Sequence, residues 1–306
     1  MNQAFTAKYT PNHVLLGSGG FGFVTTANRV TDGIEVAVKF ILKEKVPPNA
    51  WARDPILGLI PTEVYILRNV HHVNIIQYLD YYEDKIFLYL VTELHGGSWG
   101  GPSLLLTSTL DSQETASSSS STAVNGSILE RRNSCDLFEC IEFYQRFNED
   151  QARHVFRQIV SAVAYLASKK IIHRDIKDEN ILIDRDFNVK LIDFGSATLL
   201  DAEGNVVDGL FLGTLQYAAP EILSGKPYRG TECEVWSLGC CLYIMLAGEA
   251  PFESPSDVIK PGRPLAPRTE LSQSVTNLIM WMLEKNPQSR ATVRDVLRHP
   301  WVVGSN

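Results

Sequence analysis

The chain has 306 residues, of which 44% are hydrophobic and 21% are charged, and its net charge is −7. This composition is typical of a soluble globular protein with a sizeable core, and the acidic balance argues against nucleic acid as a partner. The sequence has neither an N-terminal apolar signal segment nor 18 consecutive apolar residues, so we expect no membrane span and a location in the cytoplasm, with the nucleus as a second compartment.

Residues 1–97 predict a β-rich region that contains one main helix. Short apolar runs rich in Val, Ile, Phe and Tyr predict strands within 13–30, 33–42 and 85–94. Between the second and third runs, Val64, Leu67 and Val70 keep a helical spacing, which predicts a helix over 61–70.

Residues 98–134 differ in composition from both flanking regions. They are rich in Ser, Thr and Gly, include five consecutive serines, and show no sustained hydrophobic period. Such a segment buries too little apolar surface to offset the entropy of ordering it, so we predict a disordered insertion in a surface connection.

From residue 135 to 306 the pattern becomes mostly helical. The run 149–170 is amphipathic, and the run 234–248 is apolar nearly all round, which predicts a buried helix. Two further helices are expected over 272–286 and 292–302. The cysteines show no metal-binding spacing, and Cys240 and Cys241 lie in an apolar run, so we expect buried thiols.

A glycine-rich motif follows the first strand run and fits the pattern GxGxxG: Gly17, Ser18, Gly19, Gly20, Phe21 and Gly22. Glycines let a backbone pass close to phosphate oxygens. A dinucleotide-binding motif is the alternative, but it needs a helix directly after the glycines, and residues 23–26 continue as a strand. The sequence therefore favours a glycine-rich hairpin over a nucleotide.

Lys39 closes an alternating strand 17 residues after Gly22. A lysine at a strand end is often only solvated. The spacing nevertheless favours a cation that meets phosphates beneath the hairpin, and Glu63, on the predicted helix, is its expected anionic partner.

The charged stretch HRDIKDEN at 173–180 precedes an apolar strand run, and a polar turn is its simplest interpretation. Its residue types also suit phosphoryl transfer. Asp175 would accept a proton from a substrate hydroxyl, and Lys177 would neutralise developing charge. Asn180 and Asp193, of the later Asp-Phe-Gly motif, offer oxygen ligands that suit Mg²⁺. Together with the glycine motif, Lys39, Glu63 and Ala219-Pro220-Glu221, this order makes the polar-turn interpretation untenable.

These motifs resemble those of the eukaryotic protein kinase superfamily over nearly the whole chain. The resemblance implies an α+β bilobal fold, with an N-lobe over 1–97 and a C-lobe over 135–306, and it implies ATP and Mg²⁺ as cofactors. By resemblance, the residues that contact the adenine and the hinge are Val24, Ala37, Leu182, Thr92 (the gatekeeper), Glu93 and His95. It also implies an apolar stack of Leu67, Tyr78, His173 and Phe194, and an ion pair of Glu221 with Arg290.

The sequence resembles serine/threonine kinases in one further arrangement. Lys177 lies two residues after Asp175, and Thr214 is placed to contact both. The segments 39–67, 136–142 and 171–183 resemble PAS kinases of the fungal type, and more distantly Pim kinases. The implied partners are protein substrates with Ser or Thr. Asp136 and Glu179 would lie near the ribose and favour Arg three residues before the acceptor. A monomer is expected.

Two departures from the kinase pattern bear on regulation. Phe211 stands where many kinases have a phosphorylatable residue, so we expect activity without phosphorylation of the activation segment. Glu234 stands where most kinases have an Asp that braces the HRD backbone.

A pseudokinase scaffold and a small-molecule kinase are the alternatives. The first is disfavoured because Lys39, Asp175, Asn180 and Asp193 are all present, and the second by the Ala-Pro-Glu segment.

Overall fold

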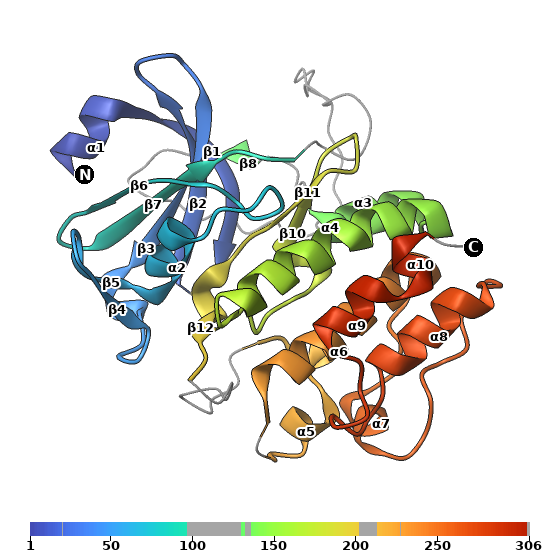
Figure 1. Ribbon diagram of the computed structural model, residues 1–306. Helices are drawn as coiled ribbons and strands as arrows, with labels where there is room; N and C mark the ends of the chain where they lie inside the picture. Colours follow the sequence, from blue (N-terminus) through green and yellow to red (C-terminus); the bar gives the residue numbers. More distant parts are fainter. Residues whose placement is uncertain (20, 97–129, 132–135, 202–212, 227, 305–306) are drawn as a thin grey trace, which may run out of the picture. The chain divides into compact units, whose positions relative to one another are not determined.

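The computed structural model describes all residues except 20, 97–129, 132–135, 202–212, 227 and 305–306 (Figure 1). The described residues form two compact units. The first comprises residues 1–45, 80–94 and the described part of 98–134, and the second comprises 46–79, 95–96 and the described residues from 136 onward. The first unit is mainly strand and the second mainly helix, so the predicted α+β class is confirmed. The lobe boundaries at 97 and 135 stay a prediction.

The first unit is built on an antiparallel sheet to which one short parallel strand is added. The strand order among the described residues is β6-β7-β3-β2-β1-β8. Its elements are α1 (Gln3–Lys8), β1 (Tyr9–Gly19), β2 (Gly22–Arg29), β3 (Glu35–Leu42), the 3-10 turn Lys43–Lys45, β6 (Tyr78–Glu83), β7 (Phe87–Glu93) and β8 (Glu130–Arg131). The three predicted strand runs are thus confirmed. The short strand β8 lies within 98–134, and the disorder predicted for the rest of that segment falls outside the described residues.

Helix α1 and strand β6 are elements that the sequence pattern did not indicate. Phe5 of α1 is fully buried and stacks on Tyr89 of β7, with ring centroids 5.1 Å apart. Five of the six residues of β6 are half-buried, so the strand lacks the alternation of buried and exposed residues by which a strand is recognised.

The second unit is mainly helical. Its strands are β4 (Trp51–Asp54), β5 (Gly58–Pro61), β9 (Ile171–Ile172), β10 (Ile181–Ile183), β11 (Val189–Leu191) and β12 (Thr198–Leu199). Its helices are α2 (Thr62–Asn69), α3 (Leu137–Tyr144), α4 (Glu149–Ser168), α5 (Pro220–Leu223), α6 (Gly230–Ala247), α7 (Pro255–Ile259), α8 (Gln273–Met282), α9 (Val293–Arg298) and α10 (Pro300–Val303). Short 3-10 turns span Asp178–Asn180, Phe194–Ser196 and Leu215–Tyr217.

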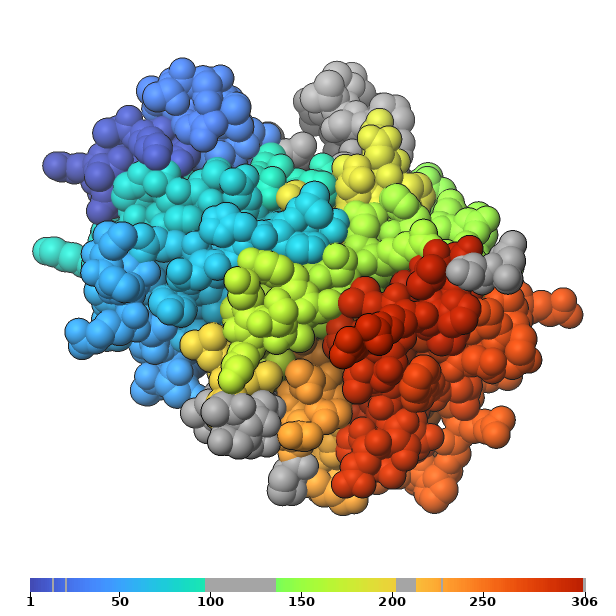
Figure 2. Space-filling model, in the orientation of Figure 1, coloured from blue at the N-terminus to red at the C-terminus, as the bar shows by residue number. Residues whose placement is uncertain are grey.

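Helices α4 and α6 form the centre of the second unit. A capping box of Asn148 and Gln151 starts α4, and its apolar face is buried. Helix α6 is buried along most of its length and ends at Gly248, whose φ of +71° and close approach to the Gln145 carbonyl require glycine. The C-terminal helices α9 and α10, red in Figure 2, pack against α4, which remains visible beside them on the face shown.

Most predicted helices are confirmed, and one is corrected. The run 292–302 forms two short helices instead of one, because Pro300 cannot continue α9 and begins α10, where His299 caps the new helix. Cys140, Cys233, Cys240 and Cys241 are free and buried, as expected for the apolar run. Among the helices of the described residues, none has both the length and the apolar character needed to cross a membrane.

Candidate active site

The side chain of Asp175 lies at the centre of a hydrogen-bond network in the second unit. Its Oδ1 accepts hydrogen bonds from the backbone N–H and the hydroxyl of Thr214, each 2.8 Å long. Its Oδ2 accepts one from Asn180 Nδ2, also 2.8 Å, and Lys177 Nζ lies 3.7 Å from the same oxygen. The network fixes the direction of the carboxylate, and it brings together four residues that the sequence placed in one site.

His173 supports this segment from beneath and is fully buried. One ring nitrogen, Nε2, lies 2.9 Å from the carbonyl oxygen of Ile192, and Nδ1 receives the N–H of Asp175 at 3.4 Å. A carbonyl only accepts and an amide only donates, so these contacts require the neutral tautomer with the proton on Nε2. The ring also packs edge-on against Phe194, at 4.7 Å between centroids. This is one contact of the apolar stack that was expected.

Asn180 and Asp193 are brought together by the backbone that joins their segments. The N–H of Ile192 donates to the carbonyl of Asn180 over 2.9 Å. The amide nitrogen of Asn180 is used by the backbone and side chain of Asp175, which leaves its side-chain oxygen for a ligand. Asp193 holds a left-handed backbone, with φ of +58°. Two oxygen donors of this type fit Mg²⁺, which commonly uses one or two carboxylates with phosphates and water.

Lys177 also lies 3.8 Å from Glu179, so it stands between two carboxylates. Glu179 is about half exposed, at 48% of its side chain. Partial burial raises the pKa of Glu179, the nearby Lys177 opposes that rise, and Asp178 adds to it.

Asp178 itself is buried and accepts a 2.6 Å hydrogen bond from the hydroxyl of Tyr217. This Asp178–Tyr217 contact ties the 173–180 segment to the residues after Thr214, and no motif in the sequence indicates it.

The expected pair of Glu221 and Arg290 is confirmed. Two hydrogen bonds of 2.7 and 2.9 Å join the guanidinium to the carboxylate, and both side chains are buried. Burial alone would raise the pKa of Glu221, but the hydrogen bonds and charge of Arg290 outweigh it and lower the pKa. Arg290 further donates to the carbonyls of Glu232 and Glu284, so the guanidinium joins α5, α6 and the end of the α8 segment.

The glycine motif forms a hairpin in the first unit. Gly17, Ser18 and Gly19 of β1 pair with Val24, Phe23 and Gly22 of β2, and β2 continues as a strand to Arg29. Among the described glycines of the motif, Gly22 alone is required sterically: its φ is +154°, and a Cβ there would lie 1.8 Å from the Phe40 carbonyl oxygen. Gly17 and Gly19 have open space around the corresponding position. Gly20 lies outside the described residues.

Residues expected near the adenine share one face of this sheet. Val24 pairs with Lys39 across β2 and β3, and Ala37 pairs with Thr92 across β3 and β7. Directly paired antiparallel residues project to the same face, and positions 37 and 39 share a face by alternation. Val24, Ala37, Lys39 and Thr92 are all half-buried there. Glu93, next along β7, pairs with Val36.

The remaining predicted residues belong to the second unit. Glu63 is buried on α2, and Lys39 lies in the other unit, so their ion pair stays a prediction. Leu182, in β10, is bridged to Asp136, which caps α3 by accepting the N–H of Glu139 at 2.9 Å. His95 Nε2 lies 3.0 Å from the carbonyl oxygen of Asn188.

A family model described as "Protein kinase domain" matches residues 11–119 and 114–302. The chain belongs to the protein kinase family. It is 41% identical to the mouse PAS domain-containing serine/threonine-protein kinase, over 94% of this chain and 18% of that protein. It is 32% identical to the serine/threonine-protein kinase PSK1 of Saccharomyces cerevisiae, over 94% of this chain and 19% of that protein.

The zebrafish (Danio rerio) serine/threonine-protein kinase pim-2 is 33% identical, over 99% of this chain and 87% of that protein. The expected likeness to PAS kinases and to Pim kinases is therefore confirmed. The kinase chain spans less than a fifth of the length of the mouse and yeast relatives.

Proposed function

We propose that this kinase domain transfers the γ-phosphoryl group of ATP to serine and threonine hydroxyls of proteins. The observation that carries the proposal is the fixed Asp175 carboxylate, held by Thr214 and Asn180 with Lys177 beside it. Asp175 orients the acceptor hydroxyl and accepts its proton. Lys177 stabilises the charge that builds on the transferred group, and Thr214 orients the Asp175 carboxylate through its two hydrogen bonds.

Nucleotide binding is assigned to residues of both units. We assign the phosphates of ATP to Gly17, Ser18, Gly19, Gly20, Phe21 and Gly22 and to Lys39, with Glu63 as the predicted partner of Lys39. Val24, Ala37 and Leu182 enclose the adenine, while Thr92, Glu93 and His95 form the hinge. Asn180 and Asp193 hold Mg²⁺, which when bound neutralises charge on the phosphates.

Substrate choice follows from the acidic residues near this segment. Glu179 is half exposed and only partly neutralised by Lys177 at 3.8 Å. We assign Glu179 and Asp136 to the recognition of an arginine three residues before the acceptor, because a guanidinium pairs well with carboxylates. One oxygen of Asp136 caps α3 by accepting the N–H of Glu139, whereas the Glu179 side chain is half exposed, so we assign the larger share of this preference to Glu179.

Activity is proposed to be independent of activation-segment phosphorylation. In the described residues Arg174 Nε already donates to the carbonyl of Ser196, which ties the 173–180 segment to the start of the activation segment. Phe211, on which the sequence argument rests, lies outside the described residues. We further propose that the kinase acts as a monomer in the cytoplasm, with the nucleus as a second location.

The test is a transfer assay with protein produced in bacteria and treated with phosphatase. A peptide with Arg three residues before a single serine is compared with the same peptide carrying Ala there, with D193A as the control protein. We expect Mg-dependent transfer to the Arg peptide, at least tenfold weaker transfer to the Ala peptide, and none by D193A. ATP binding without transfer would replace this proposal with a scaffold that performs no chemistry. Activity only after treatment by another kinase would overturn the phosphorylation-independent part alone.

A further inference from the structure

Glu234 of α6 carries a buried carboxyl group whose two oxygens have unequal surroundings. The residue is 3% exposed. One oxygen, Oε1, accepts the backbone N–H groups of both His173 and Arg174, the latter over 3.1 Å. The other, Oε2, is buried and has no hydrogen-bond partner among the described residues. A carboxylate would leave half of its charge on this second oxygen, which accepts no hydrogen bond from the described residues.

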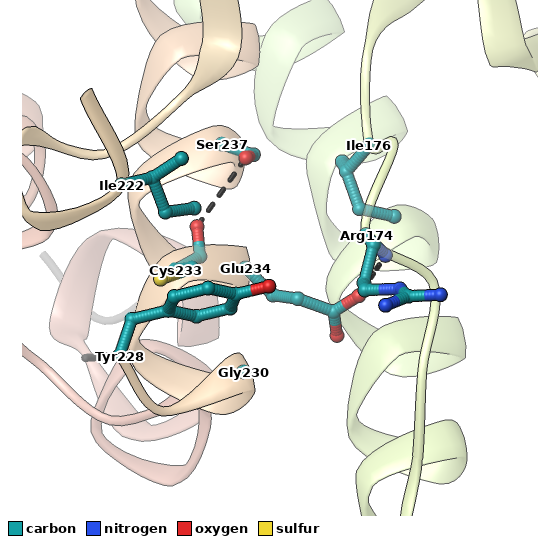
Figure 3. Close-up of a pocket in the computed structure, with 8 residues that line it drawn as sticks. All are labelled: Arg174, Ile176, Ile222, Tyr228, Gly230, Cys233, Glu234 and Ser237. Carbon is teal, nitrogen blue, oxygen red and sulfur yellow. Dashed lines mark hydrogen bonds between the residues drawn. The ribbon is translucent and has the colours of Figure 1, made fainter. Parts of the chain in front are cut away.

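A small cavity borders this carboxyl group, and Figure 3 shows Glu234 reaching from α6 toward Arg174 with Tyr228 alongside. Its volume is about 10 Å³, which corresponds to about one water molecule. The cavity is lined by Arg174, Ile176, Ile222, Tyr228, Gly230, Cys233, Glu234 and Ser237. The space is large enough to receive a hydroxyl hydrogen and one water, but it is too small to solvate an ion.

The groups that face Glu234 provide little compensating charge. From the 173–180 segment come neutral His173 and the Arg174 guanidinium, which is engaged with the Ser196 carbonyl. From α6 itself comes Cys233, whose burial raises the pKa of its thiol, so it stays uncharged. The loop before α6 contributes Tyr228, a neutral phenol, and α5 contributes the apolar Ile222. Arg174 is therefore the one cation among these groups.

We propose that Glu234 is a positioning residue that keeps its proton up to neutral pH, so that an uncharged carboxyl group supports the catalytic segment. Its carbonyl oxygen accepts both N–H groups, and its hydroxyl points into the cavity. This arrangement satisfies the two backbone donors without a buried charge, whereas an ionised group would leave one oxygen unsatisfied at a substantial free-energy cost. A Glu at this position thereby supports Asp175 without adding a negative charge beneath it.

The electrostatic balance at Glu234 agrees with this geometry. Burial raises the pKa of Glu234 to about 7, and the hydrogen bonds from Arg174 and His173 and the charge of Arg174 only partly oppose that rise. In the unfolded chain the pKa of this carboxyl group returns to its ordinary value of 4.5. The folded protein therefore binds the proton more tightly than the unfolded chain does. The stabilisation that results is complete when the pH is below the pKa of Glu234 in the unfolded chain. It declines as pH rises, and it is gone when the pH is above the pKa of Glu234 in the folded protein.

The first test compares the thermal stability of the wild type with that of E234Q from pH 5 to pH 8.5. Glutamine has the same shape and keeps an acceptor oxygen, but it cannot titrate. We expect the melting temperature of the wild type to fall relative to that of E234Q by several degrees between pH 5 and 7.5, and then to stay level. A difference that is constant, or that grows in favour of the wild type as pH rises, would overturn the proposal. This readout does not depend on the proposed kinase activity.

A second measurement serves if E234Q does not fold. The infrared difference spectrum of wild-type protein between pH 6 and pH 8.5 should lose a protonated-carboxyl C=O band that titrates near neutrality. Labelling of glutamate with ¹³C checks that the band comes from a glutamate, and its persistence in E179Q excludes Glu179, whose pKa is also raised. Absence of such a band would show that Glu234 is ionised throughout, and would overturn the proposal.

The activity readout rests on the proposed function and uses matched substitutions. E234Q should keep kcat within about threefold of the wild type at pH 7, since the two N–H acceptors remain, whereas E234A should lose at least tenfold. If E234Q is as impaired as E234A, the negative charge is required and the proposal is wrong. If the wild type itself shows no transfer, the proposed function fails, while the stability test still decides the state of Glu234.

Discussion

The catalytic segment at 173–180 and the glycine hairpin at 17–22 are held in their conformations by different interactions. The catalytic segment is held by side chains: Asp175 alone receives three hydrogen bonds from Thr214 and Asn180, and His173 and Glu234 support the backbone beneath it. The hairpin is held by its backbone pairing between β1 and β2 and by the absence of a side chain at Gly22.

The difference teaches where each region is vulnerable. In a network of side chains, a small chemical change at one atom removes a specific interaction and leaves the fold intact. In a hairpin defined by its backbone, most side-chain changes are tolerated, and only an added Cβ at a crowded position alters the geometry. Substitutions should therefore affect the chemical step in the first region and nucleotide binding in the second.

The largest effect is expected at Asp175. D175N keeps the size and polarity of the side chain, but it removes the proton acceptor and places an NH₂ group where Thr214 or Asn180 donates. We expect kcat to fall by about 10³-fold or more, since loss of a general base costs about 10²–10⁴-fold and the network is disturbed as well. The melting temperature should change little. Steady-state kinetics and calorimetry on the same preparation measure both, and a kcat within tenfold of wild type would remove Asp175 from the proposed role.

A smaller effect is expected at Thr214, which contributes two of the hydrogen bonds to Asp175. T214A loses the hydroxyl but keeps the backbone N–H, so the carboxylate remains partly oriented. We expect kcat to fall about 10- to 100-fold, which corresponds to the loss of one hydrogen bond to a charged group.

T214S is the matched control for this prediction, because serine restores the hydroxyl without the methyl group. Activity of T214S should return to within a few-fold of wild type. Equal losses in T214S and T214A would mean that the methyl packing, and not the hydrogen bond, is what Thr214 contributes.

Much of the catalytic segment could be predicted from the sequence, because its chemistry lies in residue types at short fixed spacings. Asp175, Lys177 and Asn180 stand within six residues, and a short segment can bring them to one place in few ways. The Glu221–Arg290 pair spans 69 positions, and it was expected only through the resemblance to kinases. Periodicity alone would not have joined those two residues.

Other features could not be predicted, for identifiable physical reasons. Strand β6 exposes both faces to a similar extent, so it gives no alternating pattern. Which glycine of the hairpin is required depends on the position of the Phe40 carbonyl in the neighbouring strand, which the motif does not contain. The unequal surroundings of the Glu234 oxygens depend on Tyr228, Arg174 and the cavity between them, and these come together only in the folded unit.

The smallest effect is expected at Gly22, where G22A adds a methyl group that would lie 1.8 Å from the Phe40 carbonyl oxygen in the present backbone. The backbone must shift, and a strained position of this kind costs about 1–3 kcal/mol, so the melting temperature should fall by a few degrees. G17A is the matched control, since nothing lies within 4 Å of the added Cβ. Because the shift moves the hairpin and not Asp175, KM for ATP should rise severalfold in G22A while kcat stays within about twofold. If G17A and G22A lose the same stability, steric crowding by Phe40 does not define the hairpin, and the contrast between the two regions would have to be redrawn.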